Sequence, residues 1–292
     1  SDISKIKCKV IWTLHDMWPF CGAEHYTDDL RYIEGYTNKN RPKNETGFDL
    51  NKFVWNKKIK HYKKIDKIIC TSKWMLDCAK KSYLFKNKSI SQIPLLLDHD
   101  LWKPYEREFA RNFFNLKTKN KIILYGADNF LKNKRKGFEI FKESIDQVHK
   151  TFDEKFEVAL FGTNEIDNSL IQKQFKNIKI TNFGKVSDDS TLRLIYSCSD
   201  LVVIPSLTEA FGLVALEAIH CGIPCVVFED TGLTSIIDHH KNGYISKYNS
   251  TDDLKNGIIW CLKNLNNKDK IFNDAINKFD NDQILKKYLT FI

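Results

Sequence analysis

Short apolar runs recur along the chain, and polar loops or segments with helical spacing separate them. These runs are rich in β-branched residues and are bounded by turn residues, which is typical of strands buried on both faces of a parallel sheet. The alternation of such strands with helices predicts an α/β fold with parallel sheets. We expect strands at 9–14, 67–71, 89–95, 121–126, 157–162, 178–184, 201–204, 225–228 and 243–245.

Apolar positions three and four residues apart predict helices between these runs. The helix expected over 49–65 has an apolar stripe that runs from Trp55 to Ile65, and lysines crowd the rest of its surface. Such a helix can lie on an anionic membrane, or it can be a solvated surface helix packed on a sheet. The lysines of this helix are Lys57, Lys58, Lys60, Lys63 and Lys64. Residues 27–48, which precede the helix, are polar and predict a mobile loop. Further helices are expected at 72–82, 137–150, 188–198, 212–221, 251–264, 268–278 and 281–290.

The segment 200–228 predicts one strand–loop–helix–strand unit of a parallel sheet. Its loop joins the carboxyl end of a strand to the start of a helix, where open α/β sheets bind ligands. The N–H groups of Phe211, Gly212 and Leu213 would point outward there, and the helix dipole favours negative charge. Gly212 lets the backbone approach a ligand closely. The segment therefore predicts a phosphate site.

Two carboxylates flank this predicted phosphate site. Glu209 lies in the loop, and Glu217 lies about two turns further along the helix. Carboxylates on both sides of an anion site suit a ligand that carries hydroxyls at both ends of its phosphates. A nucleotide sugar has this layout.

The frame Pro-Ser-x-x-Glu-Ala-Phe-Gly-x-x-x-x-Glu-Ala, with Glu209 and Glu217 as its glutamates, resembles the signature of retaining glycosyltransferases of the GT-B type, family 4. The resemblance implies two Rossmann-like domains with parallel sheets facing a cleft. In this family a lysine in an Arg-Lys-Gly context binds the diphosphate, and Lys136 matches it. Many members also have an arginine where this chain has Ala127. The implied donor site comprises Arg135, Lys136, Gly184, Glu209, Ala210, Phe211, Gly212, Leu213 and Glu217.

The strand at 9–14 runs directly into the segment His15-Asp16-Met17-Trp18-Pro19-Phe20. This segment is similar to one in a capsule, colanic-acid and O-antigen subgroup of the same family. The resemblance implies that His15 contacts the transferred sugar near the reacting carbon, and that His15 and Glu209 are the catalytic residues. It also suggests an acceptor side at Asp16, Trp18 and His25. The alternative interpretation is that His15 is a hydrogen-bonded histidine at a strand end.

Charge is distributed unevenly along the 292 residues, whose net charge is +9. Residues 1–116 have a net charge of +8, and the rest have +1. A basic first part suggests an anionic partner such as a membrane surface, although a general bias toward Lys and Asn explains it too. Nucleic acid is not expected as a partner, because the second part is nearly neutral and no nucleic-acid motif is present.

Composition and cysteine usage favour a cytoplasmic protein, which we expect to be peripheral on the inner face of the plasma membrane. No apolar run approaches the about 20 residues of a membrane span, and the N-terminus has no signal-peptide core. The eight cysteines are scattered and predict reduced core thiols. We expect no metal and no cofactor, because the fixed groups of the donor site can replace a cation.

We expect three parts, with bounds at 1–105, 106–280 and 281–292. The first part supplies only the later strands of a Rossmann-like domain, so we expect an incomplete acceptor-side domain and a fragment or partial record. The second is the nucleotide-sugar domain, and the third is a helix that crosses back toward the first. Asp98-His99-Asp100 spells a metal-binding motif of another glycosyltransferase fold, but it falls in the linker and is interpreted as chance.

The function predicted by the resemblance is transfer of a hexose from a UDP- or GDP-linked sugar to a polysaccharide or lipid-linked oligosaccharide, with retention at the anomeric carbon. Two alternatives remain open from the residues alone. The chain could be a catalytically impaired binding or partner subunit of the same fold, or another enzyme on this scaffold, such as a phosphorylase or epimerase. The sequence does not determine the sugar, the base, the acceptor, the linkage or the oligomeric state.

Overall fold

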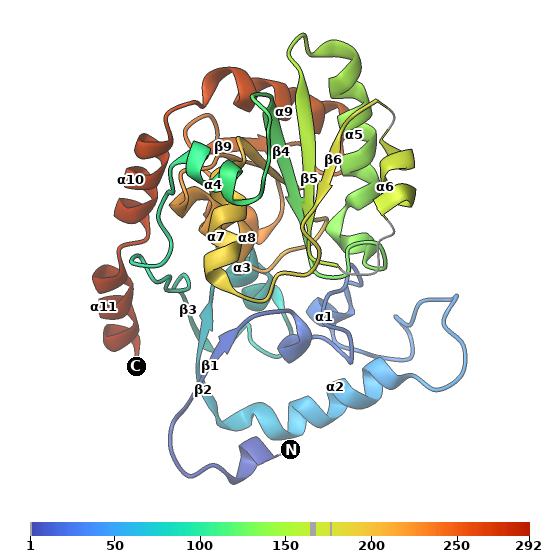
Figure 1. Cartoon of the computed structure of the whole chain (residues 1–292). Coiled ribbons are helices and arrows are strands. Elements are labelled where there is room, and N and C mark those ends of the chain that lie inside the picture. Colours follow the sequence, from blue (N-terminus) through green and yellow to red (C-terminus); the bar gives the residue numbers. More distant parts are fainter. Residues whose placement is uncertain (1, 164–167, 176) are drawn as a thin grey trace. The chain divides into compact units, whose positions relative to one another are not determined.

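Two separate parallel sheets organise the chain in this computed structural model, which describes residues 2–163, 168–175 and 177–292 (Figure 1). The smaller sheet lies in a first unit made of the residues up to Leu95, of 209–211 and of 281–292. The larger sheet lies in a second unit made of 96–208 and 212–280. The expected α/β class with parallel sheets is confirmed.

The sheet of the first unit has the order β1-β2-β3, and both pairings are parallel. Its strands are β1 (Val10–Leu14), β2 (Ile65–Cys70) and β3 (Ser89–Gln92). The third strand is shorter than the expected 89–95, because Pro94 has no N–H to donate to a neighbouring strand. The helical elements of this unit are η1 (Asp2–Lys5), η2 (Trp18–Phe20), α1 (Arg31–Glu34), α2 (Leu50–His61), η3 (Tyr62–Lys64), α3 (Lys73–Lys81) and α11 (Asn281–Phe291).

The sheet of the second unit has the order β6-β5-β4-β7-β8-β9, with every pairing parallel. Its strands are β4 (Lys121–Gly126), β5 (Phe156–Phe161), β6 (Ile180–Asn182), β7 (Leu201–Ile204), β8 (Cys225–Phe228) and β9 (Gly243–Ser246). The helical elements are α4 (Arg107–Phe113), η4 (Lys134–Lys136), α5 (Phe138–Thr151), α6 (Asn168–Gln174), α7 (Asp189–Cys198), α8 (Leu213–His220), η5 (Gly232–Ser235), α9 (Thr251–Asn264) and α10 (Lys268–Lys278).

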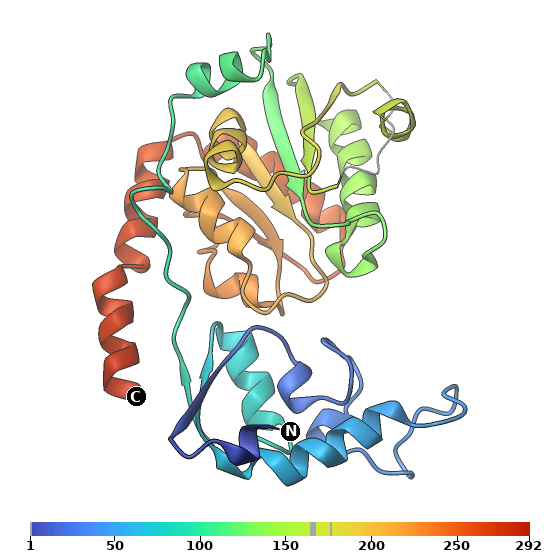
Figure 2. The same cartoon turned by 60° about the horizontal axis from the view of Figure 1, so that its bottom comes forward.

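Helices cover both faces of the larger sheet, which explains why its central strands are continuous apolar runs (Figure 2). Every residue of β5, β7 and β8 is buried. On one face α5 packs against α9, and α9 packs against β8 and β9. On the other face α8 packs against β7, with α7 and α10 beside α8.

Side-chain caps fix the start of several helices where the sequence predicted them. Ser72 accepts a hydrogen bond from the N–H of Met75 at the start of α3. Asp188 accepts from Thr191 at the start of α7. Each cap satisfies a backbone N–H that has no partner inside its helix. The helix boundaries near these residues are therefore local properties of the sequence.

The segment 27–48 is more ordered than the expected mobile loop. It contains α1, and the guanidinium of Arg31 is only 1% exposed. Arg31 is paired with Asp29, with Glu45 at 3.1 Å and with Asp49 at 3.4 Å. A buried guanidinium needs such partners, and these three tie the segment to the start of α2.

All eight cysteines are free thiols. Six of them are buried, as expected for core cysteines, whereas Cys8 is exposed. Burial raises the pKa of Cys70 to about 12 and the pKa of Cys198 to about 11. These thiols therefore stay protonated at neutral pH and are poor nucleophiles. No helix in the described part of the chain is both long and apolar enough to cross a bilayer.

Candidate functional site

The strand order of the second unit reverses direction between β4 and β7. From β4 the chain adds β5 and β6 on one side, and from β7 it adds β8 and β9 on the other. Ligands of open α/β sheets bind at the carboxyl ends of the two strands that flank such a reversal. The segments that follow these strands, 127–136 and 205–212, therefore form the candidate site.

These two segments are bonded directly to one another. The N–H of Leu207 donates to the carbonyl oxygen of Arg135 at 2.8 Å, and the guanidinium of Arg135 donates to the carbonyl of Thr208. Gly137 has a φ of +70°, and a Cβ added there would lie 1.9 Å from the carbonyl oxygen of Pro205. Only glycine permits this approach.

Lys136 is held by its backbone at the same place. The hydroxyl of Tyr125, the fifth residue of β4, donates to the carbonyl oxygen of Lys136 at 3.1 Å. Lys136 lies in η4, directly before Gly137 and the start of α5. The structure therefore brings two predicted residues, Arg135 and Lys136, to the reversal point on a backbone fixed from two strands. Cations so placed suit a phosphate ligand.

The first turn of α8 supplies backbone donors on the β7 side. Gly212 has a φ of +104°, and its carbonyl oxygen accepts the N–H groups of Ala215 and Leu216. The N–H groups of Leu213 and Val214 precede the first hydrogen bond inside the helix, and Leu213 is 46% exposed. Two outward N–H groups at a helix start favour an anion.

Glu217 faces a partner that the sequence analysis missed. The hydroxyl of Tyr196, on α7, donates to the Glu217 carboxylate at 2.8 Å. Burial raises the pKa of Glu217 to about 7, although the hydrogen bond from Tyr196 acts in the opposite direction. The sequence pattern marked Tyr196 only as part of an apolar helix face. A carboxylate poised near neutral pH can respond to a ligand that donates hydroxyl hydrogen bonds.

Gly184 lies just beyond β6, at the same edge of the sheet. Its φ is +69°, its N–H donates to the side chain of Asn182 at 3.0 Å, and its carbonyl accepts the N–H of Gly162 at 2.8 Å. A Cβ added to Gly162 would lie 2.2 Å from the carbonyl oxygen of Ala127. These close backbone approaches connect the ends of β4, β5 and β6.

Glu209, Ala210 and Phe211 complete the segment between Pro205 and Gly212. By their contacts these three residues group with the first unit, although the chain on both sides of them belongs to the second. Ala210 is 3% exposed and Phe211 is 3% exposed, so neither side chain is solvated.

The predicted acceptor-side residues of the first unit form one turn after β1. The Asp16 carboxylate accepts the N–H of Trp18 at 3.0 Å, and its other oxygen lies 2.5 Å from Nδ1 of His25. The N–H of Met17 donates to the carbonyl of His25 at 2.9 Å. His15 is exposed at the end of β1, directly before this turn. The structure thus brings Asp16, Trp18 and His25 together, with His15 adjacent in the chain.

Lys58 differs from the expectation that the lysines of α2 crowd the surface outside its apolar stripe. It is 4% exposed and donates to the carbonyls of Trp18, Cys21 and Gly22, the last two at 3.1 and 2.6 Å. Burial lowers its pKa to about 8. Lys58 follows Trp55 by three residues, so its place on the apolar stripe was a signal that could have identified it.

The Asp98-His99-Asp100 segment forms a turn. Oδ1 of Asp98 accepts the N–H of Asp100 at 2.9 Å and the N–H of Leu101 at 3.2 Å. The His99 ring stacks on His220 with 5.2 Å between centroids. Among the described residues, no group of three or more His, Cys, Asp and Glu side chains is arranged to hold a metal ion. Metal independence stays a prediction.

Relatives in the curated proteins are partial matches. The chain is 24% identical to N-acetyl-alpha-D-glucosaminyl L-malate synthase of Bacillus anthracis over 212 residues, which are 70% of this chain and 53% of that protein. It is 25% identical to mannosylfructose-phosphate synthase of Agrobacterium fabrum over 230 residues, which are 73% and 49% of the two chains. The chain thus spans about half the length of these curated relatives.

Solved structures match nearly the whole chain in fold. Sucrose-phosphate synthase from Thermosynechococcus elongatus aligns with a TM-score of 0.69 and 19% identity, covering 98% of this chain and 67% of that one. Anabaena HepE in complex with UDP and glucose aligns with a TM-score of 0.65 and 16% identity, covering 97% and 71%. These neighbours confirm the expected GT-B type of α/β fold. A model of the family described as Glycosyl transferases group 1 matches residues 106–278, more than half of the chain. The chain therefore belongs to the group 1 glycosyl transferases.

Proposed function

We propose that this protein transfers a hexose from a nucleoside-diphosphate sugar to a polysaccharide or a lipid-linked oligosaccharide, with retention of the anomeric configuration. The observation that carries the proposal is the bonded pair of segments at the reversal point. Arg135 and Lys136 there adjoin a segment that ends in the open N–H groups of α8. Such a group of donors suits a diphosphate.

Six of the predicted residues have a role in this proposal. The new bond forms between the oxygen of an acceptor hydroxyl and the anomeric carbon, while the bond from that carbon to the diphosphate breaks and the hydroxyl proton passes to the departing diphosphate. Negative charge then gathers on the diphosphate, where Lys136, Arg135 and the N–H of Leu213 stabilise it electrostatically. Glu217 accepts hydrogen bonds from the ribose, Glu209 binds sugar hydroxyls, and His15 contacts the sugar near the reacting carbon.

Names of relatives support the donor class without naming the donor of this chain. A neighbour of similar fold was solved with UDP and glucose, and another with UDP and a GlcNAc-containing compound. We infer a UDP- or GDP-linked donor, no metal requirement, and a place in the retaining family 4 and its capsule, colanic-acid and O-antigen subgroup. The resemblance around His15 and the Glu209–Glu217 frame supports the subgroup.

Membrane attachment belongs to the same proposal. Phe48, Leu50 and Phe53 lie at the start of α2 and are 71%, 54% and 44% exposed. Nζ of Lys57 lies 4.3 Å from the centroid of the Phe53 ring. Exposed apolar side chains beside lysines suit the interface of an anionic bilayer, where a lipid-linked acceptor would be found.

The test is a thermal-shift titration with UDP, GDP, ADP and CDP, each with and without magnesium, followed by transfer assays with the matching nucleotide sugars. Stabilisation by one nucleotide, with sugar transfer that needs no magnesium, supports the proposal. Binding without transfer would instead favour a partner subunit. Release of free sugar phosphate would favour a phosphorylase. If no nucleotide binds, the donor-site assignment is wrong.

A further inference from the structure

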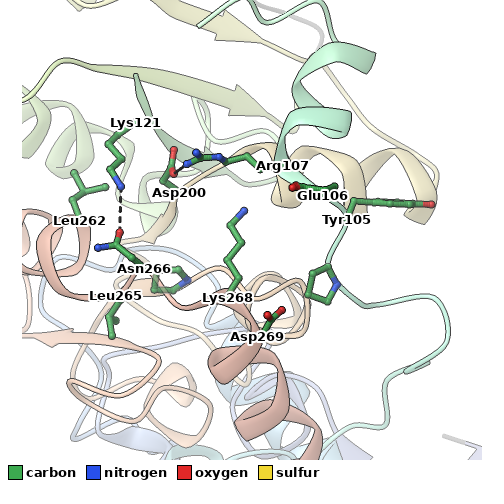
Figure 3. A pocket seen from close by; sticks show the side chains of 12 residues that line it. Tyr105, Glu106, Arg107, Lys121, Asp200, Leu262, Leu265, Asn266, Lys268 and Asp269 are labelled. Atoms are coloured by element: carbon green, nitrogen blue, oxygen red, sulfur yellow. Dashed lines mark hydrogen bonds and ion pairs between the residues drawn. The ribbon is translucent and has the colours of Figure 1, made fainter. Parts of the chain in front are cut away.

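A cavity lies at the edge of the larger sheet that is opposite to the donor-site segments, beside the amino ends of β4, β7 and β8 (Figure 3). Its volume is about 640 Å³, within the range of small-molecule sites. Every residue that lines it belongs to the second unit. The lining residues are Pro104, Tyr105, Glu106, Arg107, Lys121, Asp200, Pro224, Leu262, Leu265, Asn266, Lys268 and Asp269.

Lys268 is the central cation of this cavity. Its ammonium donates to the carbonyls of Ser197 and Ser199, at 2.9 and 3.3 Å, which leaves one N–H for the cavity. Figure 3 shows the side chain pointing into the cavity, toward Arg107 and Asp200. Burial lowers the pKa of Lys268 to about 8, so its charge is incompletely stabilised by the protein alone.

One acidic residue of the cavity, Asp200, is already neutralised by other groups. Asp200 accepts from Arg107 at 2.9 Å, from Arg111 at 2.8 Å and from the N–H of Ile122 at 2.8 Å. Two guanidinium groups thus face one carboxylate, and Lys268 adds a further positive charge. Arg107 is 40% exposed, and among the described residues its hydrogen-bond partner is Asp200 alone. Its other N–H groups remain available to a ligand.

The rest of the lining is suited to hydroxyl groups. Lys121 donates to the side-chain carbonyl of Asn266 at 3.2 Å, and the Asn266 amide donates to the carbonyl of Lys263 at 3.4 Å, which leaves one amide N–H of Asn266 for a ligand. Glu106 and Asp269 also line the cavity, and their carboxylates can accept hydrogen bonds from hydroxyls. Asp269 stands in the first turn of α10, where the backbone N–H groups also favour an anion.

We propose that this cavity binds a small hydroxylated phosphate ester, with its phosphate on Arg107, Lys121 and Lys268 and its hydroxyls on Glu106, Asn266 and Asp269. The ligand would join the start of α4 to the start of α10 and so act as an effector of the second unit. The proposal goes beyond the donor site, because the cavity lies at the amino ends of strands whose carboxyl ends form that site.

The test uses glycerol 3-phosphate, inorganic phosphate and sulfate as probes on the whole chain. Reaction of Lys268 with an amine-directed acylating reagent, followed by peptide mass spectrometry, reports on this cavity alone. We expect each probe to slow acylation of Lys268 severalfold, with glycerol 3-phosphate acting at the lowest concentration. Unchanged acylation of Lys268 at millimolar concentrations of all three probes would overturn the proposal.

Substitutions distinguish a specific binding site from non-specific electrostatic attraction of anions. Lys121→Gln should weaken binding of glycerol 3-phosphate about tenfold, since one charge-assisted hydrogen bond is lost. Arg107→Gln should weaken it by a similar factor. Lys270→Gln is the matched control, because Lys270 is exposed on α10, the helix that carries Lys268, but does not line the cavity. Equal loss in Lys270→Gln and Lys121→Gln would contradict the assignment.

The dependence of sulfate affinity on pH gives a second readout, since sulfate itself does not titrate near neutrality. The groups that face Lys268 are Asp200, Arg107, Arg111, Cys198, Glu106, Asp269 and Lys121. Sulfate affinity should fall as the pH rises through about 8 and Lys268 loses its proton. Lys136→Gln should leave protection of Lys268 intact while weakening nucleotide binding, so failure at one site is distinguished from failure at the other.

Discussion

The hydroxyl of Tyr196 donates a hydrogen bond to the carboxylate of Glu217 across 2.8 Å, and both side chains are held between α7 and α8. The bond stabilises the ionised carboxylate, whereas burial favours the protonated form, and the pKa of Glu217 is raised to about 7. A single carboxylate therefore changes charge in the pH range where the protein is expected to work.

Nucleotide affinity should rise with pH through about 7, because ribose hydroxyls donate to the ionised form of Glu217. Glu217→Gln should weaken binding by about 1.5–3 kcal/mol above this pH and remove the pH dependence. Isothermal titration calorimetry at several pH values, with the nucleotide that binds most tightly, measures both effects. Glu139→Gln, an exposed carboxylate on α5, is the control. An unchanged dissociation constant in Glu217→Gln would remove Glu217 from the donor site.

The stability of the ligand-free protein should also depend on the raised pKa of Glu217. The folded state holds a proton on Glu217 between the ordinary pKa of 4.5 and the raised pKa of about 7, while the unfolded state does not. The free energy of unfolding should therefore fall as the pH rises through this window, by up to roughly 3 kcal/mol for this group. Urea unfolding of the wild type and of Glu217→Gln at pH 5 and pH 8 isolates the contribution of Glu217 to this pH dependence. Parallel pH profiles would contradict it.

Lys58→Met should destabilise the first unit. The change leaves the carbonyls of Trp18, Cys21 and Gly22 without their buried donor, at a cost of about 1–3 kcal/mol for the first unsatisfied group. Urea unfolding measures the loss. Lys60→Met is the control, because Lys60 is exposed on the same helix. Equal stabilities of the two variants would show that the three carbonyls find water instead.

Gly137→Ala should lower both stability and nucleotide affinity. The new Cβ would meet the carbonyl of Pro205, in addition to the cost of about 1 kcal/mol for a side chain at positive φ. Gly47→Ala separates the two causes, because Gly47 also has positive φ but nothing within 4 Å of an added Cβ. Thermal unfolding and nucleotide titration should show a larger loss for Gly137→Ala. Similar losses would mean that the contact with Pro205 yields easily.

Phe53→Ser should weaken binding to vesicles that contain an anionic lipid, because Phe53 is exposed beside Lys57. Sedimentation with vesicles of phosphatidylglycerol and phosphatidylcholine measures the bound fraction, and raised salt should reduce it further. Phe109→Ser is the control, since Phe109 is also exposed, at 54% against 44% for Phe53, but lies on α4 of the second unit. If neither the wild type nor the variants sediment, α2 is a solvated helix.

The arrangement of the strands was largely predictable, because a strand buried on both faces leaves a continuous apolar run such as Leu201–Ile204. The chemical frame around Glu209 and Glu217 was equally visible in the sequence. The partners of the polar side chains that face inward were not visible. Tyr196 and Lys58 find their partners in segments 21 and 36 to 40 residues away, and no local pattern reveals such pairs.

The cavity at the amino ends of β4, β7 and β8 could not be predicted from the sequence for the same reason. Arg107, Asp200 and Lys268 are separated by more than 60 residues each, and they meet only because α4, β7 and α10 begin at one edge of the sheet. Each of the three residues looks like an ordinary surface charge in the sequence. Composition also misled at 27–48, where three carboxylates around Arg31 create order in a segment that is mostly polar.

The contact of Gly137 with Pro205 has a consequence for how this protein could be altered by evolution or design. Two backbones touch there, so neither connecting segment can gain a residue near the contact without pushing the other away. Changes of donor preference are therefore expected to arise from exchanged side chains at fixed loop length, and not from insertions. A library that varies the two segments together, with Gly137 kept, would sample the sequences that still fold.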